Sequence, residues 1–313
     1  MLGKKVLVTS TSFARVDDAP IRLLREAGWE VVPLKGPFSD EELASRLVDF
    51  DAVIVGNDLV GPATLRAAKK LRVIVEHGTG VDNIDLEAAK AAGIAVRNTP
   101  HTNAAAVAEY VFAGLLSLLR HVEPARRSLR EGAWAGSSFA GAELFGKTMG
   151  VVGLGHIGRL TARIARGFSM DVMYHDLVRH DDAEKDLGLR FSALADLLRQ
   201  SDVVVLHIPL VKETAGLIGK DELALMKPTA FLVNVSRGGV VREDALHEAL
   251  SCQRLAGAVI DVFETEPPAA DNPLLALDTV ICTPHLAGYT KDALIRTSMM
   301  AAEKLLEAAE GAG

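Results

Sequence analysis

The chain has 313 residues, of which 49% are hydrophobic and 24% charged, and its formal net charge is −7. No apolar run reaches the roughly 18–20 residues of a membrane-spanning helix, and the N-terminus lacks a signal-peptide pattern, so we expect no membrane segment. The acidic balance, without a Lys/Arg cluster, argues against nucleic-acid binding but is compatible with a small anionic ligand held by one or two arginines. The two cysteines, Cys252 and Cys282, lie in no motif, which favours a cytoplasmic location without a structural disulfide.

Short apolar runs alternate with helical patterns through the first hundred residues. Strands are predicted at 5–10, 29–34, 51–56, 71–78 and 93–100, and helices at 19–28, 39–48 and 62–70. Strands that alternate with helices of about ten residues indicate βαβ units and a parallel sheet.

A longer helix is predicted at 103–120, and because its apolar residues go nearly all round, we expect it to be largely buried. The stretch 123–145 mixes charge, Gly, Ser and isolated aromatics, so it is interpreted as a break. A second alternating array follows. Its strands are predicted at 148–152, 171–176, 202–206, 230–235, 256–260 and 279–283, and its helices at 156–168, 192–200 and 242–250.

The two arrays predict an α/β chain with two parallel-sheet domains, Rossmann-like or flavodoxin-like, and an active site in the cleft between them. A last helix, at about 291–309, follows a completed sheet, so we expect it to pack on the first array. The first domain is therefore predicted to be discontinuous, at 1–99 and 287–313, and the second to occupy 100–286.

The segment VVGLGHIG carries Gly153, Gly155 and Gly158 in G-x-G-x-x-G spacing, between a predicted strand and a predicted helix. In this context the first glycine permits a tight turn, the second lets a pyrophosphate approach the backbone, and the third allows close packing of helix and strand. The alternative, a glycine-rich turn without a ligand, is less consistent with the strand and helix on either side. We therefore predict a dinucleotide site.

The next strand ends in Asp176, where a dinucleotide fold places an acid that accepts the ribose hydroxyls. A carboxylate there repels the 2′-phosphate of NADP, which favours NAD(H), although the nearby Arg179 leaves room for NADP(H). A solvated surface aspartate is the alternative.

Polar residues also follow the later strands of the second array, and in such sheets ligands bind beyond the carboxyl ends of the strands. Arg237, Asp261, Glu266 and His285 all fall there. Taken alone, His285 could be an ordinary core histidine, Glu266 a solvated acid and Arg237 a structural ion-pair partner. Their convergence instead indicates hydride transfer to a 2-keto acid: His285 as acid/base, Glu266 stabilising its charged form, and Arg237 holding the carboxylate.

In the first array, Gly78, Thr79 and Gly80 follow a strand, so their N–H groups are candidates to bind a substrate carboxylate. A simple glycine turn explains these residues equally well.

These motifs resemble those of the D-isomer-specific 2-hydroxyacid dehydrogenases, most of all the phosphoglycerate dehydrogenase-like branch. The resemblance runs nearly end to end, through GTGVDNIDLEAA, NTPHTNAAAVAE, GKTMGVVGLGHIGR, LHIPL, NVSRGGVVREDAL, DVFETEPP and TPHLAG. It implies an NAD-dependent oxidoreductase with Arg237, Glu266 and His285 as its catalytic residues. It also implies that Asp261 meets the nicotinamide carboxamide and that residues 78–80 hold the substrate carboxylate.

The resemblance further makes the first domain the substrate-binding domain and the second the NAD-binding domain. It implies a homodimer built on the second domain, with residues 123–145 reaching the other subunit and Trp134 near the partner's active site. The predicted cofactor contacts, besides the three glycines of the loop, Asp176 and Asp261, are His156, Ile157, His207, Pro209, Thr214, Val235, Ser236, Arg237, His285 and Gly288.

One departure from the phosphoglycerate enzymes concerns their phosphate-binding arginines. The corresponding places carry Gly56 and Asn57, and Glu76 and His77. Losing guanidinium groups weakens binding of a phosphate at roughly 1.5–3 kcal/mol per charged hydrogen bond. Asn57 and His77, with His101, would form a more neutral substrate pocket, together with Gly78, Thr79, Gly80, Arg237 and His285.

The functional prediction is therefore a phosphoglycerate dehydrogenase-like enzyme, with a hydroxypyruvate- or glyoxylate-type 2-keto acid reductase as the alternative. A dinucleotide-sensing binding protein is a third possibility, but this chain lacks the tails that such proteins use. A formate-type enzyme is disfavoured because those pair the histidine with glutamine. No metal site is predicted.

Overall fold

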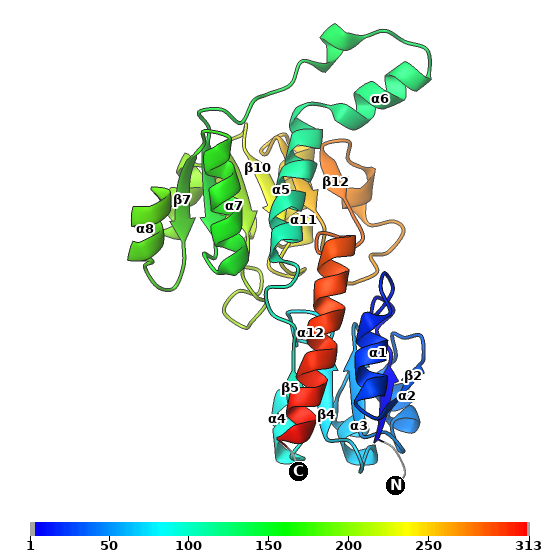
Figure 1. Cartoon of the computed structure of the whole chain (residues 1–313). Coiled ribbons are helices and arrows are strands. Elements are labelled where there is room, and N and C mark those ends of the chain that lie inside the picture. Colours follow the sequence, from blue (N-terminus) through cyan, green and yellow to red (C-terminus); the bar gives the residue numbers. More distant parts are fainter. Residues whose placement is uncertain (1–3, 312–313) are drawn as a thin grey trace. The chain divides into compact units, whose positions relative to one another are not determined.

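The computed structural model describes residues 4–311, and the chain forms two units. One unit runs to Asn103 and resumes at Tyr289, and the other is Ala104–Gly288. The boundaries lie a few residues beyond the predicted ones. The prediction of two parallel-sheet α/β domains is confirmed (Figure 1).

The first unit has a five-stranded parallel sheet in the order β2-β1-β3-β4-β5, the flavodoxin-like arrangement. Its strands are β1 (Lys4–Val8), β2 (Trp29–Pro33), β3 (Ala52–Val55), β4 (Val73–Glu76) and β5 (Ala95–Arg97). Its helices are α1 (Ala19–Glu26), α2 (Asp40–Arg46), α3 (Pro62–Ala67), α4 (Leu86–Ala91) and α12 (Lys291–Glu310).

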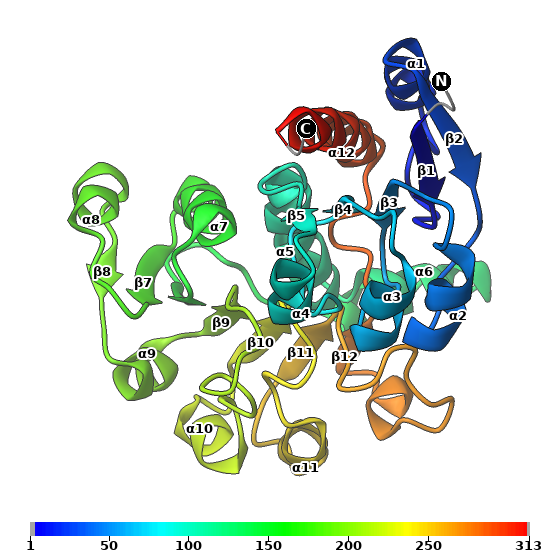
Figure 2. The ribbon, with the colours of Figure 1, turned by 90° about the horizontal axis from the view of Figure 1, so that it is seen from below.

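Alternate residues of each strand enter two different cores, because successive side chains point to opposite faces of a sheet. Val6 and Val8 pack with α1 and α12, whereas Leu7 packs with α2, α3 and α4. The two helical layers are visible in Figure 2. The last helix therefore completes the first unit, as the sequence predicted.

Capping residues and prolines in the sequence mark the N-termini of three helices of this unit. The Ser39 hydroxyl accepts a hydrogen bond from the Glu42 N–H, and the Glu42 carboxylate accepts one from the Ser39 N–H, so the first turn of α2 is capped from both sides. The α1 and α3 helices carry proline in their first turn, where its missing N–H costs nothing.

The second unit has a seven-stranded parallel sheet in the order β12-β11-β10-β9-β6-β7-β8, the Rossmann arrangement with an added strand. The strands are β6 (Thr148–Val152), β7 (Asp171–His175), β8 (Arg190–Phe191), β9 (Val203–Leu206), β10 (Phe231–Asn234), β11 (Gly257–Ile260) and β12 (Val280–Cys282). The α-helices are α5 (Ala104–Leu119), α6 (Val122–Arg130), α7 (His156–Gly167), α8 (Asp181–Leu187), α9 (Leu194–Gln200), α10 (Lys220–Leu225) and α11 (Glu243–Ser251). Two 3₁₀ turns, η1 (Gly136–Phe139) and η2 (Pro273–Ala276), complete the unit.

The helices cover both faces of this sheet. Val151 and Val205 pack with α5 and α7, while Val152 and Val204 pack with α9, α10 and α11. Strands buried on both faces explain why the sequence shows continuous apolar runs rather than alternation. Nine residues of α5 are buried, as its all-round apolar pattern predicted.

The interpretation of 123–145 as a break is only partly right. This stretch holds most of α6, a nine-residue helix with no buried residue, and then η1. Sequence periodicity is a weak guide where, as in α6, no residue of the helix is buried within residues 4–311. No single described helix is long and apolar enough to span a membrane; α5 and α6 meet that test only as a pair, and they are bent by 56°.

Candidate active site

The glycine loop after β6 has the backbone that a dinucleotide requires. Gly153 has a φ of +93°, and a Cβ there would lie 2.6 Å from the His207 carbonyl oxygen. A Cβ on Gly158 would lie 2.1 Å from the Gly153 carbonyl oxygen, so glycine is needed for helix and turn to pack. A Cβ on Gly155 would meet nothing within 4 Å, so this face of the loop is open to a pyrophosphate.

The same loop leads into α7, a helix of twelve residues. Gly155 occupies its N-cap position and offers no side chain to the first-turn N–H groups, which include those of His156 and Ile157. These N–H groups and the positive end of the helix dipole suit the phosphates of a dinucleotide.

Asp176 directly follows β7 and lies against the glycine loop. Its carboxylate accepts hydrogen bonds from the N–H groups of Leu154 and Leu177, both at 2.7 Å, and lies 3.4 Å from the Nε2 of His180. Burial raises the pKa of Asp176, but these hydrogen bonds outweigh it, and the net pKa lies below the usual value. Asp176 is therefore a carboxylate at neutral pH, which suits the ribose hydroxyls of NAD.

His285 and Glu266 form a direct pair. The His285 Nδ1 lies 2.8 Å from the Glu266 Oε2, and the other Glu266 oxygen accepts the Phe263 N–H at 3.1 Å. Burial raises the pKa of Glu266, but the hydrogen bond and charge of His285, the Phe263 N–H and the charge of Arg237 bring it below its usual value. Because Glu266 takes Nδ1, the other ring nitrogen is left for a substrate, and 47% of the His285 side chain is exposed.

Asp261 holds the segment that carries His285. One oxygen accepts the Thr283 hydroxyl at 2.6 Å and the Leu286 N–H at 2.8 Å, and the other accepts the Ala287 N–H at 2.8 Å. Asp261 is 0% exposed. In the structure, the Asp261 carboxylate therefore positions the backbone on either side of His285. The sequence predicted only a contact between Asp261 and the nicotinamide.

Arg237 lies in a turn organised by Asn234, the last residue of β10. The Asn234 amide donates to the Arg237 carbonyl at 2.9 Å, and its Oδ1 accepts from the Ser236 N–H and hydroxyl. A Cβ on Gly238 would lie 1.7 Å from the Phe263 carbonyl oxygen, so only glycine lets this turn pack against the segment that leads to Glu266. Sequence reasoning missed Asn234, although Asn two residues before Ser is a signal for such a turn.

These three side chains belong to neighbouring strands. Arg237 follows β10, Glu266 follows β11 and His285 follows β12, and the three strands pair in parallel. The carboxyl ends of parallel strands share one edge of the sheet, so the structure brings the predicted trio together.

His207 lies against the glycine loop with its backbone carbonyl and contacts α7 with its side chain. Its Nε2 lies 2.9 Å from the Thr161 hydroxyl of α7, and burial lowers the pKa of His207 to about 3, so the ring is neutral. The other predicted cofactor residues lie along the strand ends of this unit. Thr214 closes the loop after β9 by donating to the Pro209 carbonyl at 2.7 Å, Val235 is buried beside Ser236, and Gly288 follows the His285 segment.

In the first unit, residues 78–80 form an open turn after β4. The Gly78 carbonyl accepts from the Thr99 N–H and hydroxyl, and the Thr79 carbonyl accepts from Asn98. Among residues 4–311, no backbone carbonyl accepts a hydrogen bond from the N–H groups of residues 78–80. This arrangement supports the predicted carboxylate nest.

His77 requires a correction. Its Nδ1 lies 3.0 Å from the Ser12 hydroxyl and its Nε2 2.9 Å from the Ser298 hydroxyl of α12, and burial lowers its pKa to about 4. Both ring nitrogens of this 8%-exposed, neutral side chain are engaged inside the unit. His77 therefore joins β4 to α12 and does not offer a nitrogen to a substrate.

Two buried acids that the sequence analysis did not assign to the site hold its neighbouring loops. Asp58 accepts hydrogen bonds from the N–H groups of Phe38 and Gly56, and Glu76 accepts from the Asn83 amide at 3.1 Å. The same Asn83 amide donates to the carbonyls of Gly56 and Asp58. Asn57 is exposed at the end of β3, beside these acids.

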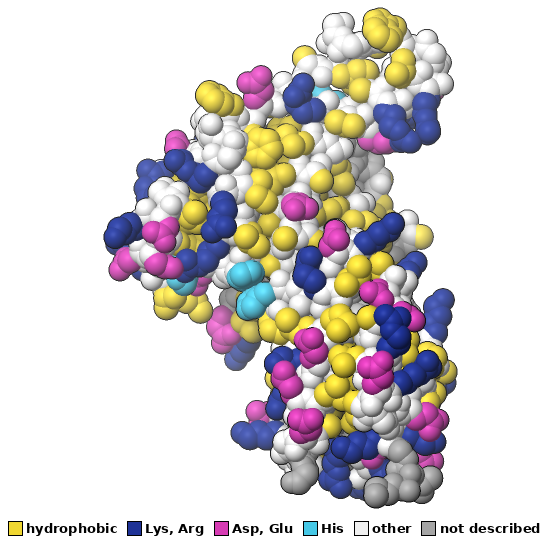
Figure 3. Space-filling model, in the orientation of Figure 1, with side chains coloured by type: hydrophobic (Ala, Val, Ile, Leu, Met, Phe, Trp, Pro, Cys, Tyr) yellow, Lys and Arg dark blue, Asp and Glu magenta, His cyan; other side chains and the backbone are white. Residues whose placement is uncertain are grey.

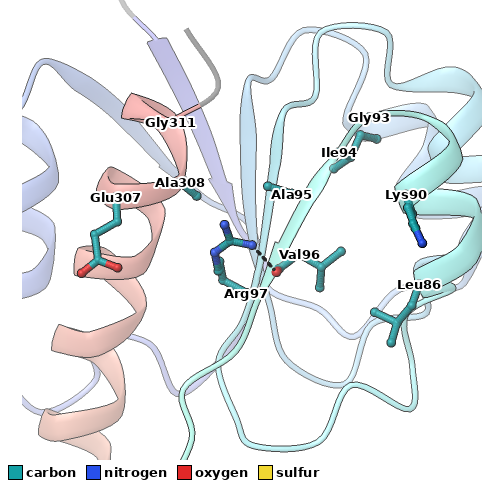
Figure 4. A pocket seen from close by; sticks show the side chains of 10 residues that line it. All are labelled: Leu86, Lys90, Gly93, Ile94, Ala95, Val96, Arg97, Glu307, Ala308 and Gly311. Atoms are coloured by element: carbon teal, nitrogen blue, oxygen red, sulfur yellow. Dashed lines mark hydrogen bonds between the residues drawn. The ribbon is translucent and has the colours of Figure 1, made fainter.

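A surface pocket of the first unit lies along the edge strand β5 and the end of α12 (Figure 4). It is lined by Leu86, Lys90, Gly93, Ile94, Ala95, Val96, Arg97, Glu307, Ala308 and Gly311. Arg97 donates to the Val96 carbonyl there at 2.9 Å. This pocket includes none of the predicted site residues. Among residues 4–311, no group of three or more His, Cys, Asp or Glu side chains is placed to hold a metal ion.

A Rossmann sheet with this glycine loop, an acid after β7 and a histidine–carboxylate pair defines a dinucleotide-dependent oxidoreductase site. Residues 112–287 match the family described as D-isomer specific 2-hydroxyacid dehydrogenase, NAD binding domain. The chain belongs to the D-isomer specific 2-hydroxyacid dehydrogenase family, and its second unit contains the NAD-binding domain.

Relatives and solved structures agree with this assignment. The chain is 39% identical over 308 residues to a D-3-phosphoglycerate dehydrogenase of Archaeoglobus fulgidus, which covers 98% of this chain but only 58% of that relative. It is 41% identical over 277 residues to a glyoxylate reductase of Korarchaeum cryptofilum, covering 87% of this chain and 83% of the relative. A D-lactate dehydrogenase of Aquifex aeolicus, solved with NAD and lactic acid, superposes with a TM-score of 0.86 at 28% identity, covering 98% of this chain and 96% of the other.

Proposed function

We propose that this protein is an NAD-dependent D-2-hydroxyacid dehydrogenase that interconverts a small 2-keto acid and its D-2-hydroxy acid. The observation that carries the proposal is the 2.8 Å contact between His285 and Glu266, on the same sheet edge as Arg237. A binding protein has no need of an acid/base histidine paired with a carboxylate.

Each residue of the trio has a distinct task in this reaction. Bound NADH supplies the hydride for the keto carbon. Arg237 binds the substrate carboxylate and carbonyl oxygen with its planar fork. His285 holds a proton on Nε2 and gives it to the carbonyl oxygen, while Glu266 stabilises the imidazolium from the other side of the ring.

The substrate is a small anionic 2-keto or 2-hydroxy acid, with the N–H groups of residues 78–80 as a second site for its carboxylate. The phosphoglycerate dehydrogenase relatives favour a phosphorylated substrate. The buried acids Asp58 and Glu76, beside the uncharged Asn57, instead favour an uncharged side group such as that of glyoxylate or hydroxypyruvate, because a dianionic phosphate meets no added cation from these three residues.

A substrate panel tests this proposal. NADH oxidation by the purified protein would be followed with glyoxylate, hydroxypyruvate, pyruvate and 3-phosphohydroxypyruvate. We expect turnover of at least one 2-keto acid, with the unphosphorylated compounds preferred. Preference for the phosphorylated compound would support the phosphoglycerate-type activity, and NADH binding without any turnover would support a binding protein.

Glu266→Gln is expected to shift the pH profile of keto acid reduction. The Glu266 carboxylate, whose own pKa is lowered partly by the hydrogen bond and charge of His285, stabilises the protonated form of the reacting imidazole, and glutamine removes this charge. The upper limit of the reductive pH profile should therefore move down by about one pH unit. Steady-state rates from pH 5 to 10 measure the shift, and an unchanged profile would contradict the role of Glu266.

We also propose a homodimer formed through the second unit, acting in the cytoplasm. The low cysteine content supports the location, and the exposed apolar surface supports the dimer. Figure 3 shows hydrophobic side chains exposed over α5 and around α6. In the segment 122–145, Trp134 is 92% exposed and Phe145 74% exposed, and we propose that this segment packs on the partner subunit, with Trp134 near the partner's active site.

Val122→Asp combined with Leu129→Asp is expected to convert the dimer into a monomer. The two side chains of α6 are 51% and 59% exposed, so charging them leaves the fold of one subunit intact and disrupts only an interface. Sedimentation velocity measures the mass. The matched control is Val48→Asp with Leu86→Asp, which charges two similarly exposed apolar residues of the first unit. Monomers in the control, or dimers in the α6 variant, would contradict the proposed interface.

A further inference from the structure

His180 links Asp176 to an arginine of the neighbouring helix. Its Nε2 lies 3.4 Å from the Asp176 carboxylate, and its Nδ1 lies 3.1 Å from a guanidinium nitrogen of Arg159. An arginine only donates hydrogen bonds, so Nδ1 is the accepting nitrogen and Nε2 carries the proton that faces Asp176. The acid of the ribose site is thus connected to Arg159 through the imidazole ring of His180.

Both arginines that flank Asp176 are held by acids in the first turn of α8. Arg159 reaches the two oxygens of Asp182 at 2.7 and 3.2 Å. Arg179, in the loop after β7, reaches the two oxygens of Glu184 at 2.8 and 2.7 Å. Each guanidinium group therefore already has a bidentate carboxylate partner.

The Glu184 side chain is a built part of this arrangement. It also accepts the Tyr174 hydroxyl at 2.8 Å, and that hydroxyl accepts the His180 N–H at 2.8 Å. Tyr174 is 0% exposed, and the Glu184 side chain is 18% exposed. These bonds fix the loop after Asp176 against α8, so the acids of α8 lie at a defined place beside the ribose site.

The local charge balance is unfavourable for a 2′-phosphate. The two guanidinium groups share this region with four carboxylates, those of Asp176, Asp181, Asp182 and Glu184. Exposed ion pairs contribute little stability, so a phosphate could displace them, but the displaced carboxylates would remain and repel the dianion. A site that binds a 2′-phosphate needs guanidinium groups whose charge is not already compensated.

We propose that the first turn of α8 is a specificity determinant for the dinucleotide: Asp182 and Glu184 compensate Arg159 and Arg179, and thereby exclude NADP together with Asp176. Removal of Asp176 alone leaves both arginines compensated and leaves NADPH binding weak. The proposal concerns binding of the dinucleotide and not turnover, so it can fail while the proposed activity holds, and the reverse.

The test uses the whole protein and measures dissociation constants of NADH and NADPH by titration calorimetry. The starting variant is Asp176→Asn. Adding Asp182→Asn is expected to tighten NADPH binding about fivefold to tenfold, because Arg159 gains an uncompensated charge, while NADH binding changes less than twofold. Adding Glu184→Gln, which retains hydrogen-bonding capacity toward Tyr174 and Arg179, is expected to act in the same direction.

Asp186→Asn in the same background is the matched control, because Asp186 is an exposed acid of the same helix that contacts neither arginine. Asp182→Glu is expected to keep the NADPH-to-NADH ratio of the starting variant. An equal gain from Asp182→Asn and Asp186→Asn would mean a general charge effect and would overturn the proposal. No gain from Asp182→Asn, or a parallel loss of NADH binding, would overturn it as well.

Discussion

Replacing His285 by alanine is expected to lower kcat for keto acid reduction about a thousandfold and to leave the dissociation constant of NADH within about twofold. Glu266 occupies Nδ1, so the imidazole has one nitrogen for the substrate, and alanine removes the only proton donor of the trio. Asp261 still holds the backbone of this segment through Leu286 and Ala287, so the cofactor site keeps its shape.

Stopped-flow reduction of the best panel substrate and calorimetric titration of NADH check this prediction. His247→Ala is the control, because it removes a half-buried histidine of α11 whose ring contacts Ser251. We expect wild-type rates for the control. A His285→Ala enzyme that keeps more than a tenth of the rate would show that the proton comes from another group.

Arg237→Lys is expected to lower kcat/KM for the keto acid about a hundredfold. Lysine keeps the positive charge but loses the planar fork that binds carboxylate and carbonyl oxygen together. The turn itself should persist, because Asn234 and Ser236 hold it through the backbone and their own side chains. The loss should therefore fall on substrate KM and kcat, with NADH binding nearly unchanged.

Steady-state kinetics over a range of keto acid concentrations measure this effect. Arg242→Lys makes the same replacement a few residues further along the chain, where the arginine is paired with Asp244. If Arg237→Lys and Arg242→Lys lose activity equally, the loss does not depend on the substrate-binding fork of Arg237. It would then be a general result of replacing an arginine at this edge of the sheet. If Arg237→Lys is nearly as active as the wild type, a single charge is sufficient and the fork has no role.

The fold was predictable because parallel sheets buried on both faces produce an unmistakable pattern. Runs such as Ala52–Val55 are apolar without interruption, and this run is followed by a turn and the predicted helix α3. The predictions missed α4, α8 and α10, helices of six or seven residues that each bury a single residue and so show no apolar stripe. The predicted helices α2, α3 and α9 have the same lengths but bury two residues each. The α6 helix was also missed, and none of its residues is buried within residues 4–311.

The candidate site was predictable to the extent that the topology determines it. Any polar residue at the carboxyl end of β10, β11 or β12 lies on one edge, so Arg237, Glu266 and His285 could be grouped before any distance was known. The roles of His77 and Asp261 could not be predicted from the sheet topology. Their tasks depend on partners distant in sequence, such as Ser298 for His77, and on burial that a single motif does not reveal.

The position of α12 has a consequence for synthesis of the protein. Ala301, Ala302 and Leu305 cover Val6, Val8 and Val75, yet they are translated after the whole of the second unit. The second unit is continuous in sequence and can fold as soon as it leaves the ribosome. The N-terminal sheet is made first, but the part of its apolar face that α12 covers stays exposed until the last helix emerges. The first unit is therefore completed after the second, in the reverse of the order in which the two sheets are made.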